Sequence, residues 1–209
     1  MARPPRFDMK QLLDAAVRLA SAGGPAAVTM SAVATEVGAP SGSVYHRLAG
    51  RPALLAEVWL RTVESFQEGY FKALEAGVDA RQAGCAAARH VVAWSRVHPE
   101  EAALLLYGAG DFGRADWPEK HLQRAERGHQ RVRTSLAALA TALGAEGPQG
   151  TEQVALAVVD LPLSLVRRHL RAGDPLPAHA EDLAEKCTAA LLDSLPTTSA
   201  SAPPVPATD

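Results

Sequence analysis

Residues 29–51 read TMSAVATEVGAPSGSVYHRLAGR, and this stretch gives the clearest indication of the fold. Its first part, 31–37, carries apolar residues at helical spacing and ends at Gly38, a residue that suits the turn after a helix. Its second part, 41–48, is equally short and is closed by Gly50. Two short helices joined by a tight glycine turn predict a helix-turn-helix, whose second helix fits the major groove of DNA.

The chain on either side of this motif is also predicted to be helical. Residues 8–22 carry leucine, valine and alanine along one helical face, and a Gly-Gly-Pro sequence follows. After the motif, 52–76 forms a longer apolar pattern that begins with a proline, which fits the first turn of a helix. The N-terminal quarter is therefore three helices followed by a long exit helix.

The start of the second helix of the motif carries side chains that suit contact with DNA. A helix in the major groove brings its first turn closest to the base edges, so small or hydrogen-bonding residues are needed there. Hydroxyl groups pair with bases or phosphates, and arginines attract the phosphate backbone, which an acid would repel. The residues that meet these needs are Ser41, Gly42, Ser43, Tyr45, Arg47 and Arg51.

The stretch from about residue 8 to residue 58 resembles the DNA-binding domain of the TetR family of bacterial transcriptional regulators. The matching pieces are LLDAAVRLASAGG (12–24) and VTMSAVATEVGAPSGSVYHRLAGRPALL (28–55), which includes the Val44-Tyr45 pair. The resemblance implies a homodimer in which the helix-turn-helix binds DNA and a helical body binds a ligand.

The resemblance also implies which residues touch DNA. Contacts with the DNA backbone are expected from Thr29, Ser43, Tyr45 and Arg51. Residues near the bases are expected to be Ser41, Gly42, His46 and Arg47, and we add Ser31 from the first helix of the motif. Two alternatives stay open: Tyr45 packs against the first helix of the chain, and His46 is simply solvated.

Charge is distributed unevenly along the chain. Residues 1–52 carry a net charge of +3 and the rest a net charge of −5. A positive head suits a protein that meets a polyanion at one end, although an asymmetry of this size also arises by chance. Arg3 and Arg6 precede the first helix, in an arm of residues 1–7 that could enter a neighbouring minor groove.

Composition narrows the class of protein. Hydrophobic residues make up 47% of the 209 residues, enough for a packed core. The two cysteines, Cys85 and Cys187, are far apart and lack the spacing of a metal site, which indicates reduced thiols. No signal peptide is recognisable, and the apolar stretch 154–166 is too short to span a bilayer. We expect a soluble cytoplasmic protein that does not bind a membrane.

The remaining chain shows helical periodicity without an alternating strand pattern, so the predicted class is all-α. We expect a DNA-binding domain over 1–52, a helical regulatory and dimerisation domain over 53–195, and a disordered tail over 196–209. A loop is expected at 144–150. The predicted helices from the exit helix onward lie at 52–76, 79–97, 99–107, 117–143, 151–171 and 179–195.

The sequence offers no support for catalysis. The seven histidines are scattered, and none pairs with another histidine or a cysteine at a spacing of three or four residues. Phosphate-binding loops and nucleophile elbows are also missing from the sequence. We therefore expect no enzyme activity, no catalytic residue, no metal site and no cofactor.

A small-molecule site is expected in the middle of the body. Trp94, Tyr107 and Trp117 would give it large apolar walls, and His90 or Asp160 would give it a polar anchor. Aromatic residues at helical spacing are also ordinary core residues, which is the alternative for this set. The net charge of the body favours a neutral or cationic ligand over an anionic one.

Asp160 stands out because it lies in VALAVVDLPLSLV (154–166), where unpaired burial of its charge would be costly. We favour an ion pair with an arginine in the core. A subunit contact and a ligand cavity are the alternatives. A face of apolar residues on 151–171 and 179–195 is expected to form a two-fold four-helix dimer contact.

The predicted function is that of a ligand-responsive transcriptional regulator, a repressor that binds a pseudo-palindromic DNA operator as a homodimer and is released by a small apolar effector. The alternative is a helix-turn-helix regulator without a small-molecule ligand, whose helical body binds a protein partner. A cavity with a few convergent polar groups would favour the first function, and a flat apolar patch the second.

Overall fold

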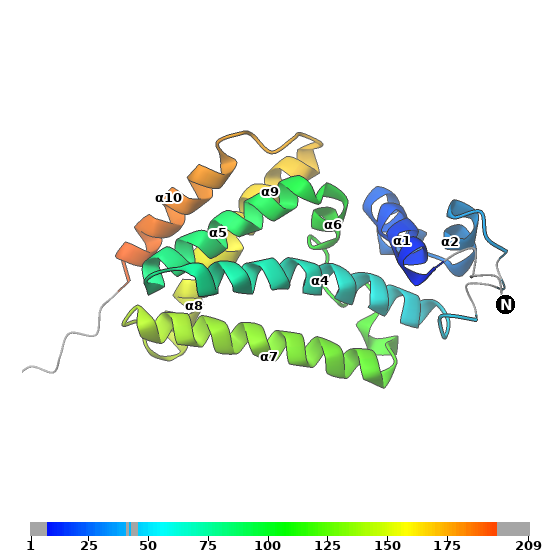
Figure 1. Cartoon of the computed structure of the whole chain (residues 1–209), viewed down its shortest axis with the longest axis horizontal. Helices are drawn as coiled ribbons and strands as arrows, with labels where there is room; N and C mark the ends of the chain where they lie inside the picture. Colours follow the sequence, from blue (N-terminus) through cyan, green and yellow to red (C-terminus); the bar gives the residue numbers. More distant parts are fainter. Residues whose placement is uncertain (1–7, 41, 43–45, 196–209) are drawn as a thin grey trace, which may run out of the picture.

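The computed structural model describes residues 8–40, 42 and 46–195, and this part of the chain is helical without any strand (Figure 1). The molecule is elongated: α1 and α2 form a head at one end, and the longer helices form a bundle behind them. The predicted all-α class is confirmed. No helix among the described residues is both long and apolar enough to cross a membrane.

The head begins with two helices, and a side chain caps the start of each. Helix α1 spans Met9–Gly23, and the Asp8 side chain accepts a hydrogen bond from the backbone N–H of Gln11. Helix α2 spans Met30–Glu36 and is capped by Thr29. Gly38 then takes a left-handed backbone conformation (φ 67°) that side-chain-bearing residues rarely adopt.

Helix α4 (Arg51–Ala76) is the element that joins the head to the bundle (Figure 1). It starts with a proline in its first turn, as predicted. One continuous helix of 26 residues therefore carries the end of the helix-turn-helix into the middle of the body.

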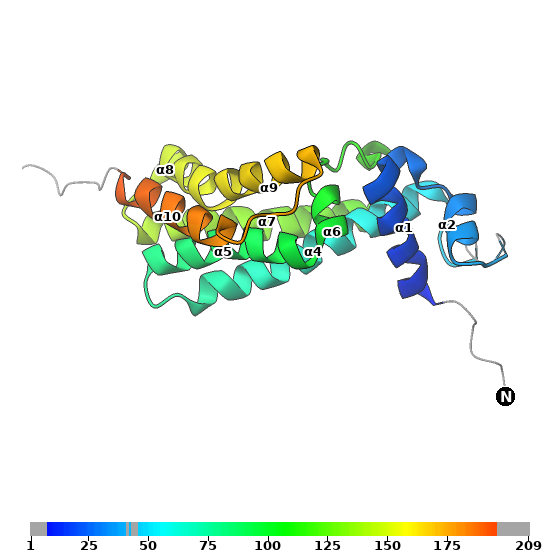
Figure 2. The ribbon, with the colours of Figure 1, turned by 90° about the horizontal axis from the view of Figure 1, so that it is seen from above.

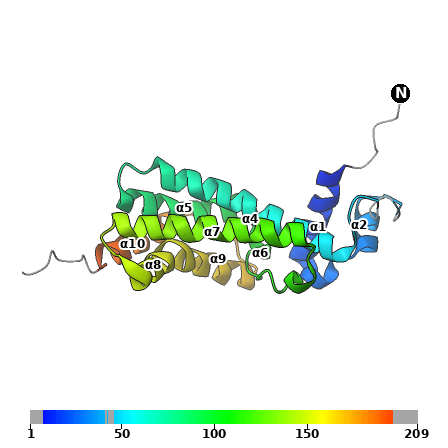
Figure 3. The same cartoon turned by 90° about the horizontal axis from the view of Figure 1, so that it is seen from below.

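Helices α5 and α7 pack against α4, and α7 runs beside it along most of its length (Figures 1 and 3). Helices α9 and α10 pack against α5, and α8 packs against α7. Most of their bounds lie within two residues of the predicted ones. They are α5 (Ala80–Val97), α6 (Pro99–Leu104), α7 (Glu119–Ala142), α8 (Gly147–Ala155), α9 (Leu161–Ala172) and α10 (Ala180–Asp193).

Two predicted boundaries were wrong. The helix expected over 99–107 ends at Leu104, and in the loop that follows, the Asp111 carboxylate accepts a hydrogen bond from the Gly108 N–H at 2.7 Å. The loop expected over 144–150 is shorter, because α8 already begins at Gly147 with a proline in its first turn. A proline at that position is a helix-start signal that the glycines around it obscured.

The helix predicted over 151–171 is one helical run with a widened turn inside it. Residues Leu156–Asp160 form a π-helical segment between α8 and α9. Pro162 follows directly, and a proline lacks the N–H that an α-helix needs and clashes with the carbonyl one turn earlier. The wider π turn accommodates the proline without breaking the helix.

The interior is divided into two hydrophobic cores. The head-side core combines residues of α1 and α2 with the first third of α4, and also with Leu104, Phe112 and Trp117 from the body. The body core begins at Tyr70 and combines the second half of α4 with α5, α7, α8, α9 and α10. The predicted boundary after residue 52 therefore does not coincide with a division in the packing.

Candidate functional site

Two of the predicted DNA contacts, Thr29 and Ser31, carry hydroxyl groups at the start of α2. The Thr29 hydroxyl accepts a hydrogen bond from the Ala32 N–H at 3.0 Å and lies 3.2 Å from the Ser31 hydroxyl. Ser31 is exposed. Thr29 thus fixes the start of α2, a helix that lies at the outer end of the molecule (Figure 2).

The second helix of the motif is described only in part. Gly42 and His46 are exposed, and the His46 N–H donates to the Gly42 carbonyl at 3.2 Å, as in a helical turn. Arg47 is half-buried, and Leu48 is buried in the head-side core. Four predicted DNA contacts lie outside the described residues: Arg6, Ser41, Ser43 and Tyr45.

Arg51 has an intramolecular role that the sequence did not reveal. Its Nε donates to the Val28 carbonyl at 2.8 Å, and a second guanidinium nitrogen donates to the Pro25 carbonyl at 2.9 Å. Both carbonyls belong to the short turn between α1 and α2. Arg51 therefore ties the start of α4 to the front of the head, and its predicted contact with DNA stays a prediction.

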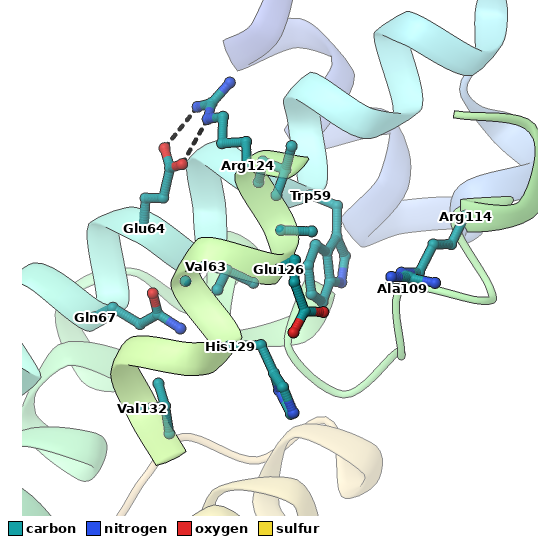
Figure 4. A pocket seen from close by; sticks show the side chains of 13 residues that line it. Trp59, Val63, Glu64, Gln67, Ala109, Arg114, Arg124, Glu126, His129 and Val132 are labelled. Carbon is teal, nitrogen blue, oxygen red and sulfur yellow. Dashed lines mark hydrogen bonds and ion pairs between the residues drawn. The ribbon is translucent and has the colours of Figure 1, made fainter. Parts of the chain in front are cut away.

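A cavity of about 460 Å³ lies between α4 and α7 (Figure 4). Its apolar walls include Trp59, Val63 and Val132, and the loop around Ala109 borders it. The volume falls within the usual range for small-molecule sites, about 300–1,000 Å³. The charged or polar side chains around it are Glu64, Gln67, Arg114, Arg124, Glu126 and His129.

One end of this cavity is closed by a network of ion pairs that we call the α4–α7 clamp, formed by Glu57, Glu64, His121 and Arg124. Arg124 donates two hydrogen bonds to Glu64, both at 2.5 Å, and a third to Glu57 at 2.8 Å. The buried His121 ring lies 3.0 Å from the other Glu57 oxygen. The clamp fastens α7 to the part of α4 that packs in the head-side core.

The clamp shifts the protonation equilibria of two of its members. Burial acts to raise the pKa of Glu57, but hydrogen bonds and charge from Arg124 and His121 outweigh it and hold the pKa below its ordinary value. The paired Glu64 and Glu57 carboxylates raise the pKa of Arg124. Glu57 and Arg124 are therefore both charged at neutral pH, whereas the buried Nδ1 of His121 has no hydrogen-bond partner within the described part of the chain.

The five predicted ligand residues do not share one cavity. His90 and Trp94 pack around Phe66, with ring centroids 5.7 and 5.4 Å from it. Trp117 is buried against Trp59, at 5.6 Å. Trp117 therefore lies behind the wall of the α4–α7 cavity, and His90 and Trp94 belong to a separate aromatic cluster.

The remaining two predicted ligand residues are exposed. The Tyr107 hydroxyl lies at the end of α1, where a side-chain carbon added at Gly24 would meet it at 3.2 Å. Asp160 is exposed at the end of the π-helical segment, so the favoured ion pair in the core is wrong. The burial was expected from the apolar composition of residues 154–166, but this segment has an exposed side as well, on which Leu156 also lies exposed.

The sequence pattern that would have located the cavity is a stripe on α4. Trp59, Val63 and Gln67 follow one another at intervals of four residues and all line the cavity. Such a stripe is typical of core residues, so by itself it does not indicate a ligand site. Which helix covers the stripe is decided by tertiary structure, and the spacing within α4 cannot reveal it.

The described residues contain no cluster of three or more histidines, cysteines or acids that could hold a metal ion. The thiol of Cys85 is buried, and burial raises its pKa, which disfavours the reactive thiolate. Among the described residues, the features that could serve binding are the exposed groups at the start of α2 and the cavity between α4 and α7.

Residues 12–58 match the family described as bacterial regulatory proteins, tetR family. The predicted resemblance is confirmed by this match, which covers α1, α2 and the start of α4. No curated protein matches the sequence.

Solved structures of transcriptional regulators share the fold over nearly the whole chain. The TetR family regulator PfmR from Thermus thermophilus is 20% identical, with a TM-score of 0.65, and 92% of this chain and 99% of that one are covered. The ketosteroid regulator KstR2 of Mycobacterium tuberculosis is 16% identical, with a TM-score of 0.68 and coverage of 91% and 97%. FadR from Bacillus subtilis, in complex with stearoyl-CoA, is 12% identical, with a TM-score of 0.67 and coverage of 88% and 98%.

Proposed function

We propose that this protein, a TetR-family transcriptional regulator by its N-terminal domain, is a repressor that binds a pseudo-palindromic operator as a homodimer and is released by a small molecule. The observation that carries the proposal is the course of α4. This one helix starts at the helix-turn-helix and then forms a wall of the α4–α7 cavity, so a change in the cavity reaches the head directly. We propose no enzymatic activity.

The proposed DNA-binding surface lies at the outer end of the head. We assign it Thr29, Ser31, Gly42, His46, Arg47 and Arg51, together with Ser41, Ser43, Tyr45 and the arm residue Arg6, which lie outside the described residues. Hydroxyls and arginines position a helix on the phosphates, and the exposed first turn reads the base edges. The functional division then lies after residue 52, with residues 53–195 as the regulatory and dimerisation part.

The proposed dimer contact is the face that α9 and α10 share along one side of the bundle (Figures 1 and 2). In the single chain, Leu183 of α10 is 39% exposed, and Leu156 of the π-helical segment that leads into α9 is 52% exposed. A second copy would cover both side chains through the same face, as a two-fold contact requires. Asp160, exposed near Leu156, would lie at the edge of this contact.

The effector is proposed to act by changing the spacing of the two heads. In a DNA-bound dimer, recognition helices lie about 34–36 Å apart, one turn of the double helix. A ligand that binds a differently spaced state more tightly shifts the population away from DNA by its differential affinity for the two states. The alternative function, a regulator whose body binds a protein instead, is supported less well, because apolar walls with a few polar groups suit a small molecule.

The experiment that tests this function is recovery of DNA fragments retained by the purified protein, followed by binding titrations with the fragment selected. The Arg47→Ala variant is expected to bind the selected operator more weakly and to lower the salt dependence by about one unit, as loss of one phosphate contact does. Arg127→Ala, which removes an exposed arginine of α7, is the matched control. Equal operator affinity of both variants would remove Arg47 from the interface.

Sedimentation tests the dimer in the same preparations. We expect a dimer at micromolar concentration, and Leu183→Asp is expected to dissociate it because the charge would be buried at the contact. A monomer in the wild-type protein would contradict the proposed α9–α10 contact.

A further inference from the structure

The charges around the α4–α7 cavity are not all neutralised by the protein itself. Glu64 is fully engaged, because it accepts two hydrogen bonds from Arg124. Glu126 lies 3.6 Å from Arg133, which stands outside the cavity. Each of the two acids at the cavity therefore has a basic partner.

Arg114, the basic residue at the other end of the cavity, differs from these acids in its lack of an ionic partner among the described residues. Arg114 makes no side-chain hydrogen bond or ion pair with any described residue. Figure 4 shows its guanidinium group beside Ala109 and Trp59, across the cavity from the Glu64–Arg124 pair. The charge left without a partner at this cavity is therefore positive.

The walls between the two ends are apolar. Trp59, Leu60 and Val63 of α4 face Ala125 and Val132 of α7 across the cavity. Gly128 leaves additional room, because a carbon added there would meet only the end of the Gln67 side chain, at 3.4 Å. A ligand that fills this space needs an apolar body, and the only charge that improves its fit is negative.

We propose that the α4–α7 cavity binds an apolar molecule with a single anionic head group, such as a carboxylate, which Arg114 recognises. A guanidinium group presents paired donors that match the two oxygens of a carboxylate. This proposal rests on the proposed function, since it names the ligand class of the effector site. It reverses the expectation of a neutral or cationic ligand, because the net charge of the body comes mostly from surface acids that do not line the cavity.

The test is calorimetry on the full-length protein with three compounds that share one apolar body: 4-phenylbutyrate, 4-phenylbutanamide and 4-phenylbutylamine. We expect the carboxylate to bind most tightly, the amide next and the amine least. In Arg114→Met, which keeps the apolar stem, the carboxylate should lose about fivefold in affinity, the effect of one partly exposed ion pair. Binding of the amide should stay unchanged in this variant.

Two further variants control for charge. Arg127→Met removes an exposed arginine of α7 outside the cavity and should leave all three affinities unchanged. Glu126→Gln should strengthen carboxylate binding slightly, because it removes a repelling charge at the cavity.

Tighter binding of the amine than of the carboxylate would overturn the proposal, as would binding of none of the three compounds. Equal losses in Arg114→Met and Arg127→Met would overturn it too, because they would reveal a general charge effect. Operator binding is measured separately on the same preparations without these compounds. A failed ligand series with intact operator binding therefore refutes the ligand class and leaves the DNA-binding function standing.

Discussion

The two hydrophobic cores of this protein share helix α4, but each packs a different part of it against different helices. The head-side core joins the DNA-binding helices to the first third of α4 and to Trp117 of the body. The body core collects the second half of α4 with the long helices behind it. The α4–α7 cavity lies along Trp59 to Gln67, where α4 passes from one core to the other.

This difference indicates where the head can move relative to the body. The head is packed together with the start of α4, so the two are expected to move as one unit, without a hinge after residue 52. A ligand between α4 and α7 acts at the junction of the two cores instead.

The largest effect is expected from a cavity in the head-side core. Leu54 is fully buried there, and Leu54→Ala should lower the free energy of unfolding by about 2–5 kcal/mol. Because this core includes body residues, far-UV circular dichroism and tryptophan fluorescence should report one common transition. A separate early transition of the head alone would contradict the shared core.

A smaller effect is expected from the α4–α7 clamp. In Arg124→Met, the Glu57 and Glu64 carboxylates lose their shared cation, and the expected loss is about 1–2 kcal/mol, less than for a fully buried pair because the side chains are partly exposed. Lys72→Met breaks the exposed pair with Glu68 and is the control, with no measurable change expected. Denaturant titrations of both variants measure the difference, and equal losses would show that the clamp is an ordinary surface pair.

The two cores should also weaken at different pH values. Burial lowers the pKa of His90 in the body. As pH drops below about 6.5, His90 therefore binds a proton more readily in the unfolded chain than in the folded one, and the free energy of unfolding falls. On the head side, the pKa values of Glu57 and Asp14 are lowered by their ion pairs. These carboxylates therefore contribute to the free energy of unfolding at neutral pH, and this contribution is lost only as pH falls below about 4.5.

Thermal unfolding between pH 8 and pH 3 measures both steps. His90→Gln should remove the step that begins near pH 6.5 and leave the acidic step, whereas Glu57→Gln should reduce the acidic step alone. If His90→Gln leaves the entire pH profile unchanged, the buried imidazole does not contribute as described.

The smallest effect is expected from Gly128 on α7. It lies in a regular helix with a free space beside it, so Gly128→Ala should raise the free energy of unfolding by about 0.5–1 kcal/mol. Denaturant titration measures this gain. A loss of stability instead would mean that the cavity wall cannot accept even a methyl group.

Much of the fold could be predicted from the sequence because its signals are local. Glycines and caps such as Thr29 mark helix ends, and the N-terminal helices follow them within one or two residues. The early end of α6 and the π turn before Pro162 could not be predicted in this way. Both depend on backbone and side-chain hydrogen bonds at the end of a helix or within it, and the spacing of apolar residues carries no information about these bonds.

The candidate ligand site was harder to predict than the DNA-binding segment. Trp94 and Trp117 were chosen as large aromatic residues, but size alone does not tell which of them borders empty space. The cavity lies between α4 and α7, beside Trp59. The distance between these helices depends on the packing of both cores, which the spacing of residues in the sequence does not reveal. The clamp residues Glu57 and His121 are 64 positions apart, so their contact was equally hidden.

The central claim, that the α4–α7 cavity controls operator binding through α4, is tested most directly by filling the cavity without any ligand. Gly128→Leu places an apolar side chain in the space that Gly128→Ala leaves open. With both variants folded by circular dichroism, we predict that Gly128→Leu binds the selected operator at least about tenfold more weakly than Gly128→Ala, within the usual range of coupling between two sites. Equal operator affinity of the two variants would contradict the claim.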